Sequence, residues 1–97
     1  MEKIVYLNLL FDLYGELLTD KQQKYFRDYY FLNLSYGEIA NKYGISRNAV
    51  YHQLSLIENK LNFYEEKLNL CSKKDKVSAI INLIDNKEAK RILENLF

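Results

Sequence analysis

The stretch SYGEIANKYGISRNAVYHQL, from Ser35 to Leu54, decides the fold. Ser35 and Glu38 have the spacing of a capping box, in which each side chain pairs with a backbone N–H left free at a helix start. Gly44 can adopt the left-handed conformation that ends a short helix and turns the chain. Ser46 offers the N-cap of the next helix. The pattern therefore predicts two helices joined by a tight turn.

The spacing of small and apolar residues indicates how these two helices pack. A helix-turn-helix needs a small residue where its helices approach, as at Ala40, and an apolar anchor in the second helix, as at Val50. A helical corner used only for packing has similar residues and stays an alternative. Because caps, turn glycine and anchor agree, we predict a helix-turn-helix at about residues 35–54.

Composition predicts one all-α domain spanning residues 1–97. The chain is 48% hydrophobic and 28% charged, and it has no proline to interrupt helices. It is too short for two independent cores. No apolar run reaches the length of a membrane span, and the acidic residues near the start do not fit a signal peptide. We expect a cytoplasmic protein without membrane insertion.

The residue inventory argues against catalysis. Cys71 is the single cysteine and His52 the single histidine, so neither a disulfide nor a histidine-based metal site is expected. The three glycines are scattered rather than gathered in a phosphate-binding loop. Glu65 and Glu66 are adjacent and would point different ways on a helix. We therefore predict no enzyme activity, no catalytic residue, no metal and no cofactor.

Two helices are predicted before the motif. The first runs from about Lys3 to Leu18, and apolar residues every three or four positions form its buried seam: Ile4, Leu7, Phe11, Tyr14 and Leu18. The second starts at Thr19, with Gln22 at the capping-box position. Its apolar side carries Phe26, Tyr29, Tyr30 and Leu34.

The helix after Ser46 is predicted to be long. A heptad-like seam of Val50, Leu54, Ile57, Leu61, Tyr64 and Leu68 continues to about Leu70. Its length of ~36 Å exceeds a compact helix-turn-helix, so its far half must pack on the first helix or on a second subunit. Leu56, Phe63 and Leu70 form a second stripe, which we predict to be core. A homodimer is therefore expected.

A C-terminal helical extension is predicted over about residues 72–97. Ser72 with Asp75 is a candidate cap for a helix from Lys73 to about Ile84. Asp85 and Asn86 look like a break, and a short last helix would run from Lys87 to Phe97.

The charge pattern weakens the case for tight nucleic-acid binding. The net charge is +1, and residues 35–70 hold equal numbers of basic and acidic residues. Proteins that bind nucleic acid through phosphates usually show a basic surface. The motif indicates nucleic acid, whereas the charge indicates weak binding or another partner.

Six residues of the motif are the candidate nucleic-acid contacts. The start of a recognition helix normally reaches base edges, so the reading face would be Arg47, Asn48, Tyr51 and His52. Lys42 and Ser46 would contact phosphate. Of the nine tyrosines, Tyr36 and Tyr51 are expected to be exposed, and most of the others to lie at the edge of the core.

Two resemblances follow from longer stretches. LTDKQQKYFRDYYFLNLSYGEIANKYGISRNAVYHQLSLIENKL resembles the helix-turn-helix of sigma factor region 4. MEKIVYLNLLFDLYGELLTDKQ, EIA with GISRNAVY, and ENKLNFYEEKLNL together resemble the YlxM family of low-GC Gram-positive bacteria and mycoplasmas. That resemblance implies an all-helical cytoplasmic protein. It also implies a regulatory part in the signal recognition particle pathway, because the family's genes tend to lie beside those of the particle's GTPases.

This chain departs from sigma region 4 at three positions of the recognition helix. Sigma region 4 commonly has basic residues there that hold DNA, whereas this chain has the neutral residues Tyr51, Gln53 and Leu56. We therefore rank first a regulatory role in protein targeting, with binding to the particle's RNA or to its GTPase subunit. A sequence-specific DNA-binding transcription regulator is the alternative, and a module that only binds protein or dimerises is the third hypothesis.

Overall fold

The computed structural model describes residues 1–96. Six α-helices follow one another: α1 (Lys3–Tyr14), α2 (Asp20–Phe26), α3 (Tyr36–Tyr43), α4 (Arg47–Leu68), α5 (Leu70–Ile81) and α6 (Lys87–Glu94). A 3₁₀ turn, η1 (Gly15–Leu17), follows α1, and a π-helical turn, η2 (Arg27–Phe31), extends α2. The described residues contain no strand, so the predicted all-α class is confirmed.

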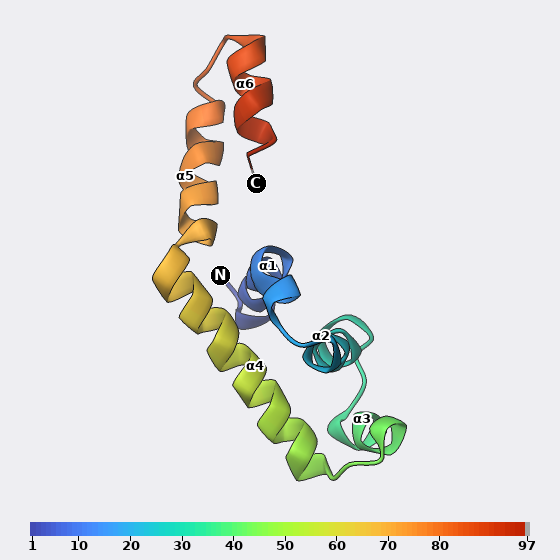
Figure 1. Cartoon of the computed structure of the whole chain (residues 1–97). Helices are drawn as coiled ribbons and strands as arrows, with labels where there is room; N and C mark the ends of the chain where they lie inside the picture. The colour runs from blue at the N-terminus through green and yellow to red at the C-terminus, as the bar shows by residue number, and fades with distance from the viewer. Residues whose placement is uncertain (97) are drawn as a thin grey trace.

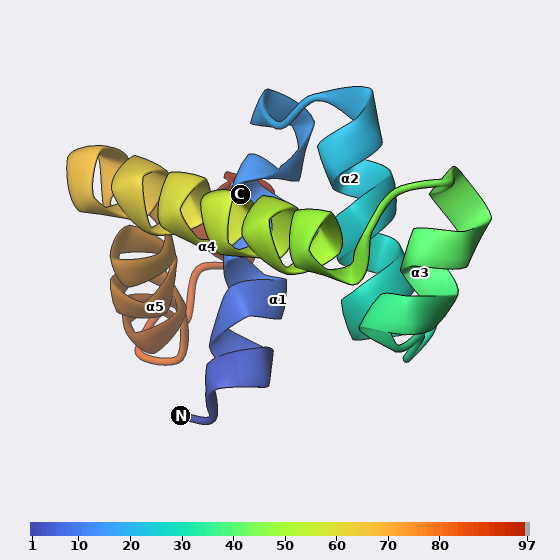
Figure 2. The same cartoon turned by 90° about the horizontal axis from the view of Figure 1, so that it is seen from below.

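Helix α4 is the axis of the molecule. Helices α1, α2 and α3 lie on one side of it, and α5 continues from its C-terminal end (Figure 1). Viewed from below, α1 crosses α4 between α5 on one side and α2 and α3 on the other (Figure 2). The molecule is elongated, with principal extents of 54 × 25 × 24 Å.

The first helix is shorter than predicted. It ends at Tyr14, and residues 15–17 form the 3₁₀ turn instead of a further α-helical turn. Glycine has low helix propensity, and the Phe11 ring lies so close to Gly15 that a Cβ there would be 3.1 Å from it. The predicted seam is buried except for Ile4, which is 56% exposed because the first turn of α1 protrudes beyond α4 (Figure 2).

Aromatic packing joins α1 to α2. The capping box predicted at Thr19 and Gln22 is present and starts α2. Phe26 is fully buried, and its ring stacks on that of Phe11 at 4.2 Å between centroids. The turn η2 then carries one buried acid, Asp28, toward α3.

The helix-turn-helix has the predicted local structure. Ser35 Oγ accepts a hydrogen bond from the Glu38 N–H, and the Ser35 N–H donates to Glu38 Oε1, both at 3.1 Å. Gly44 has φ +68°, as the tight turn requires. Ser46 caps α4 by accepting a hydrogen bond from the Ala49 N–H at 3.0 Å. The buried residues include Ile39, Ala40 and Val50.

Only one side of α4 is covered. Val50, Leu54, Ile57 and Leu61 are buried, as the first seam predicted. The prediction that the second stripe is core is wrong for Leu56 and Phe63, which are 39% and 54% exposed, and Leu68 of the first seam is exposed too. Leu70, the third residue of the stripe, lies on α5 and is half-buried against the core. Helices α1, α2 and α3 all pack on the opposite side of α4, which leaves Leu56 and Phe63 exposed.

The bend between α4 and α5 consists of one residue. Asn69 has φ +55°, a left-handed conformation that asparagine tolerates. The predicted cap by Ser72 and Asp75 is wrong, since α5 already begins at Leu70. The amides of Cys71 and Ser72 donate to the side chain of Glu65, on the preceding helix.

The C-terminal extension forms a helical hairpin. The predicted break is confirmed: residues 82–86 lie outside the helices, and Asn86 caps α6 by accepting from the Ala89 N–H. Helix α5 ends at Ile81, earlier than predicted, and α6 ends at Glu94. Phe97 lies outside the described residues. Among the described residues of the hairpin only Cys71 is buried, and α1 is the main neighbour of α5 in the rest of the described chain.

Candidate nucleic-acid interface

The first half of α4 presents most of the predicted contacts on one surface. Arg47, Asn48, Tyr51 and His52 are all exposed, in the first two turns of the helix. At 100° per residue, Asn48, Tyr51 and His52 point away from the buried seam. The structure thus brings four of the six candidate residues to the outward start of α4, which is the part of a recognition helix that reaches base edges.

Ser46 and Arg47 are partly engaged within the protein. The Ser46 hydroxyl caps α4, although the residue is exposed. The Arg47 guanidinium lies against α3, where a Cβ on Gly37 would be 3.0 Å from its Nε. The absence of a side chain at Gly37 therefore leaves space for Arg47 beside α3.

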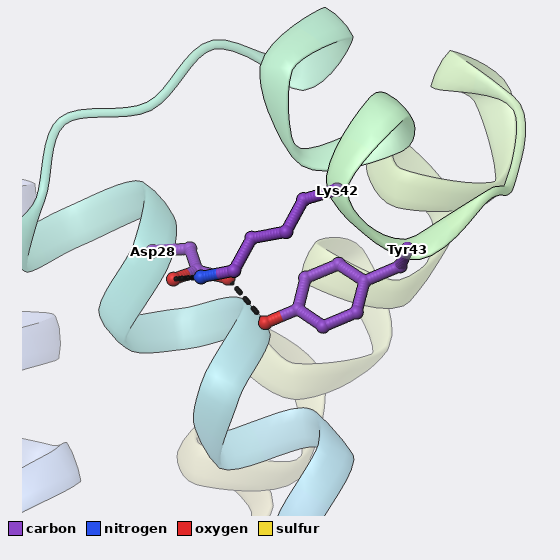
Figure 3. Close-up of polar contacts among 3 residues, drawn as sticks. All are labelled: Asp28, Lys42 and Tyr43. Atoms are coloured by element: carbon purple, nitrogen blue, oxygen red, sulfur yellow. Dashed lines mark hydrogen bonds and ion pairs between the residues drawn. The ribbon is translucent and has the colours of Figure 1, made fainter.

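Lys42 is held by a buried carboxylate. Its Nζ lies 2.9 Å from Asp28 Oδ1, and the Tyr43 hydroxyl donates to Asp28 Oδ2 at 2.5 Å (Figure 3). The Asp28 side chain is 4% exposed, whereas that of Lys42 is 48% exposed. The hydrogen bond to Asp28 raises the pKa of Lys42, so its ammonium stays charged while it is paired.

The Asp28 contact changes the electrostatics of the interface. Burial, followed by the hydrogen bond to Asp28, also raises the pKa of Tyr43, so its hydroxyl remains a donor at neutral pH. With Lys42 neutralised by Asp28, Arg47 is the one cation of the six candidates without an acidic partner among the described residues. Sequence reasoning missed Asp28, although an acid among Tyr25, Phe26 and Tyr29 could have indicated a buried charge.

The two tyrosines expected to be exposed differ. Tyr51 is exposed, as predicted, whereas Tyr36 is half-buried because its ring stacks on Tyr29 with centroids 5.2 Å apart. Sequence reasoning also missed a hollow of about 410 Å³ between α2 and α4, which Lys21 and Gln53 line beside the candidate contacts.

In residues 1–96, His, Cys, Asp and Glu side chains form no group of three or more that could hold a metal ion. Cys71 is buried, and burial is the main cause that raises the pKa of its thiol. None of the described helices combines the length and apolarity needed to span a membrane.

Comparison with known proteins identifies the family. Residues 1–96 match the family described as "UPF0122: Putative helix-turn-helix protein, YlxM / p13 like". A UPF0122 protein of Desulforamulus reducens is 43% identical over 100 residues, covering 99% of this chain and 86% of the relative. One of Halalkalibacterium halodurans is 46% identical over 81 residues, covering 84% and 74%. The chain therefore belongs to the UPF0122 family of YlxM/p13-like helix-turn-helix proteins.

Proposed function

We infer that the chain is a non-enzymatic regulatory protein of the signal recognition particle pathway. It binds the particle's RNA or a protein component through α3 and the first half of α4. The observation that carries this proposal is the composition of the exposed start of α4, where Asn48, Tyr51 and His52 face outward and Arg47, beside α3, is the one cation. The pathway itself rests on the YlxM resemblance and on the gene neighbourhood of that family.

A recognition helix whose first half carries a single cation suits some ligands better than others. Duplex DNA is held by many phosphate contacts from Lys and Arg. Structured RNA is recognised largely by shape, and exposed bases stack on aromatic side chains such as Tyr51. A sequence-specific DNA-binding regulator remains the second candidate, because Arg47 and Asn48 lie where a recognition helix reads bases. Because both proposed ligands are components of the targeting particle, the proposal also includes a cytoplasmic location for the protein.

Binding of the particle's RNA by wild-type protein is expected to exceed binding of a duplex DNA of equal length in gel shifts. Arg47→Glu should weaken RNA binding by about tenfold, since one lost contact and one new repulsion typically cost ~1–3 kcal/mol. Few cations should give a shallow dependence of affinity on salt. Arg91→Glu, an equal charge change on α6, is the control and should leave affinity unchanged.

Two outcomes of this experiment, combined with a pull-down on immobilised GTPase subunit, would redirect the proposal. Stronger binding of the duplex DNA would favour the transcription regulator. If wild-type protein binds neither RNA nor immobilised GTPase subunit at low salt, the targeting role is contradicted.

The proposal includes a homodimer of the single domain formed by residues 1–97. Its support is the uncovered stripe on α4, Leu56 and Phe63, together with apolar residues exposed on the hairpin, Ile80 and Ile92. Clusters of exposed apolar side chains often mark interaction surfaces. Sedimentation at roughly tens of micromolar should show a dimer, since weaker dimers dissociate below that range. A strict monomer at that concentration would contradict the dimer without affecting the RNA-binding face.

A further inference from the structure

A second surface, beside the candidate interface, has the features of a binding site. A hollow of about 270 Å³ lies between the start of α1, η2, α3 and α4, and we call it the tyrosine pocket. Its walls include four aromatic side chains and one carboxylate: Tyr29, Tyr30, Tyr36, Tyr51 and Glu58. The rings of Tyr29 and Tyr30 meet at 85°, and those of Tyr36 and Tyr51 at 65°. Rings at such angles form corners, as in the aromatic cages that bind cations.

The carboxylate of Glu58 makes the pocket acidic. Its Oε1 accepts a hydrogen bond from the Tyr30 hydroxyl at 2.5 Å. Burial, followed by this hydrogen bond, raises the pKa of Tyr30, so the Tyr30 phenol stays protonated as the donor. An adjoining hollow of about 350 Å³, which shares the walls formed by Tyr29 and Tyr30, is lined by a second acid, Glu38.

The protein's own Lys3 shows that a cation reaches this site. Its Nζ lies 3.2 Å from Glu58 Oε2, and among the described residues Lys3 is the one basic side chain that lines either hollow. The Lys3 side chain is 74% exposed, whereas that of Glu58 is 24% exposed. An ion pair with one partner so exposed contributes little, so a better-placed cation can displace Lys3.

We propose that the tyrosine pocket binds the guanidinium group of an arginine side chain from a basic segment of a partner protein. The group replaces the Lys3 ammonium at Glu58 and lies against the tyrosine rings. A guanidinium fits these walls better than an ammonium because it is planar, weakly hydrated and able to stack on aromatic faces. This site goes beyond the proposed RNA contacts, because Tyr51 lines it whereas Arg47, Asn48 and His52 do not.

A nucleobase is the competing occupant, since bases also stack on tyrosine. The acids Glu38 and Glu58 would repel the phosphates that accompany a base, whereas they attract a basic peptide. Charge complementarity therefore favours the arginine side chain.

The test is an NMR titration of the intact chain with Nα-acetyl-arginine methylamide. Saturable shifts are expected at the rings of Tyr29, Tyr30, Tyr36 and Tyr51, with a dissociation constant on the order of 10 mM for a probe of one side chain. The citrulline analogue has the same shape without the charge, and it should produce no saturable shift. The lysine analogue should bind more weakly than the arginine probe.

Two variants make the expected result specific. Glu58→Gln should weaken binding about tenfold, because a neutral amide replaces the carboxylate. Lys3→Gln should tighten it about two- to fivefold, because the internal competitor is removed. Glu66→Gln, an equal change elsewhere on α4, should have no effect. Lys3 is exposed, so its variant remains informative even if Glu58→Gln disturbs the fold.

Three results would overturn the proposal. They are equal binding of the arginine and citrulline probes, an unchanged or weaker affinity in Lys3→Gln, and absence of saturable shifts at the tyrosine rings. Stronger shifts of the Tyr29 and Tyr30 rings, which lie outside the proposed RNA contacts, by uridine monophosphate would instead assign the pocket to a nucleobase.

Discussion

Replacing Asp28 with alanine is expected to lower the free energy of unfolding by about 2–3 kcal/mol, because the Lys42 ammonium and the Tyr43 hydroxyl both lose a charged acceptor. The Lys42 ammonium and the Tyr43 hydroxyl both converge on this carboxylate (Figure 3). Both partners lie on α3, so Asp28 fastens the first helix of the motif to η2. Lys42 is half-exposed and can regain water, which keeps the cost below that of a fully buried ion pair.

Urea denaturation at pH 7 measures this loss. If the m-value is unchanged, the change in the midpoint urea concentration multiplied by the m-value gives the change in the free energy of unfolding. Asp12→Ala is the matched control, because Asp12 is exposed on α1 and makes no hydrogen bond or ion pair with another described residue. If the two variants lose equal stability, the Asp28 contacts do not hold α3 in place.

The isosteric variant Asp28→Asn separates stability from binding. The amide oxygen can still accept the Tyr43 hydroxyl, but the neutral side chain no longer neutralises Lys42. The freed ammonium would be available to phosphate, so the salt dependence of RNA binding should steepen by about one unit in slope. Lys42→Ala in the same background should remove that gain.

The helix-turn-helix could be predicted because its determinants are local. Ser35 with Glu38, Gly44 and Ser46 each act within four residues, so their spacing in the sequence already specifies the hydrogen bonds and the turn. The exposed start of α4 followed from the same register, and Arg47, Asn48, Tyr51 and His52 lie together as that register requires.

Contacts between distant residues could not be predicted. A heptad stripe such as Leu56 and Phe63 records apolar spacing, but the spacing does not say whether another helix of the chain covers it. Lys42 was predicted to be free for phosphate, whereas its pairing depends on Asp28, fourteen residues earlier. Likewise, the sequence around Ser72 suggests a cap, whereas the start of α5 is capped by Glu65 together with Tyr14, which lies 56 residues before Leu70.

Glu65 is the centre of the junction that joins the hairpin to the body. Its Oε1 accepts hydrogen bonds from the Tyr14 hydroxyl at 2.6 Å and from the Cys71 N–H at 3.0 Å, and its Oε2 accepts the Ser72 N–H at 3.3 Å. The Tyr14 oxygen in turn accepts the Leu70 N–H at 3.0 Å. Two side chains, from α4 and α1, therefore satisfy three amides at the start of α5, where a carboxylate also meets the positive end of the helix dipole.

Glu65→Ala is expected to cost about 2 kcal/mol, since two backbone donors and one hydroxyl lose a charged acceptor that is partly exposed to water. The loss should be local, because α5 and α6 pack mainly on each other and on α1. Hydrogen exchange should therefore quicken most at Leu70, Cys71 and Ser72, and less in the core of α4. Glu66→Ala is the control, because Glu66 is exposed and has no hydrogen-bond partner among the described residues. Equal exchange at α5 in both variants would show that Glu65 does not cap this helix.

Alkaline pH provides an independent test of the same contact. Burial, followed by the hydrogen bond to Glu65, raises the pKa of Tyr14 from 10.0 to about 12. The folded state therefore holds this proton more tightly than the unfolded state, and the resulting stability is fully present below pH 10 and is lost as the pH rises to about 12. Glu65→Gln removes the charged acceptor, so the pKa of Tyr14 in the folded variant should lie closer to its value in the unfolded chain. The difference in the free energy of unfolding between wild type and Glu65→Gln should consequently be largest below pH 10 and should shrink toward pH 12. Urea denaturation at a series of pH values measures this difference. A difference that stays constant with pH would mean that Glu65 stabilises the junction without the Tyr14 proton.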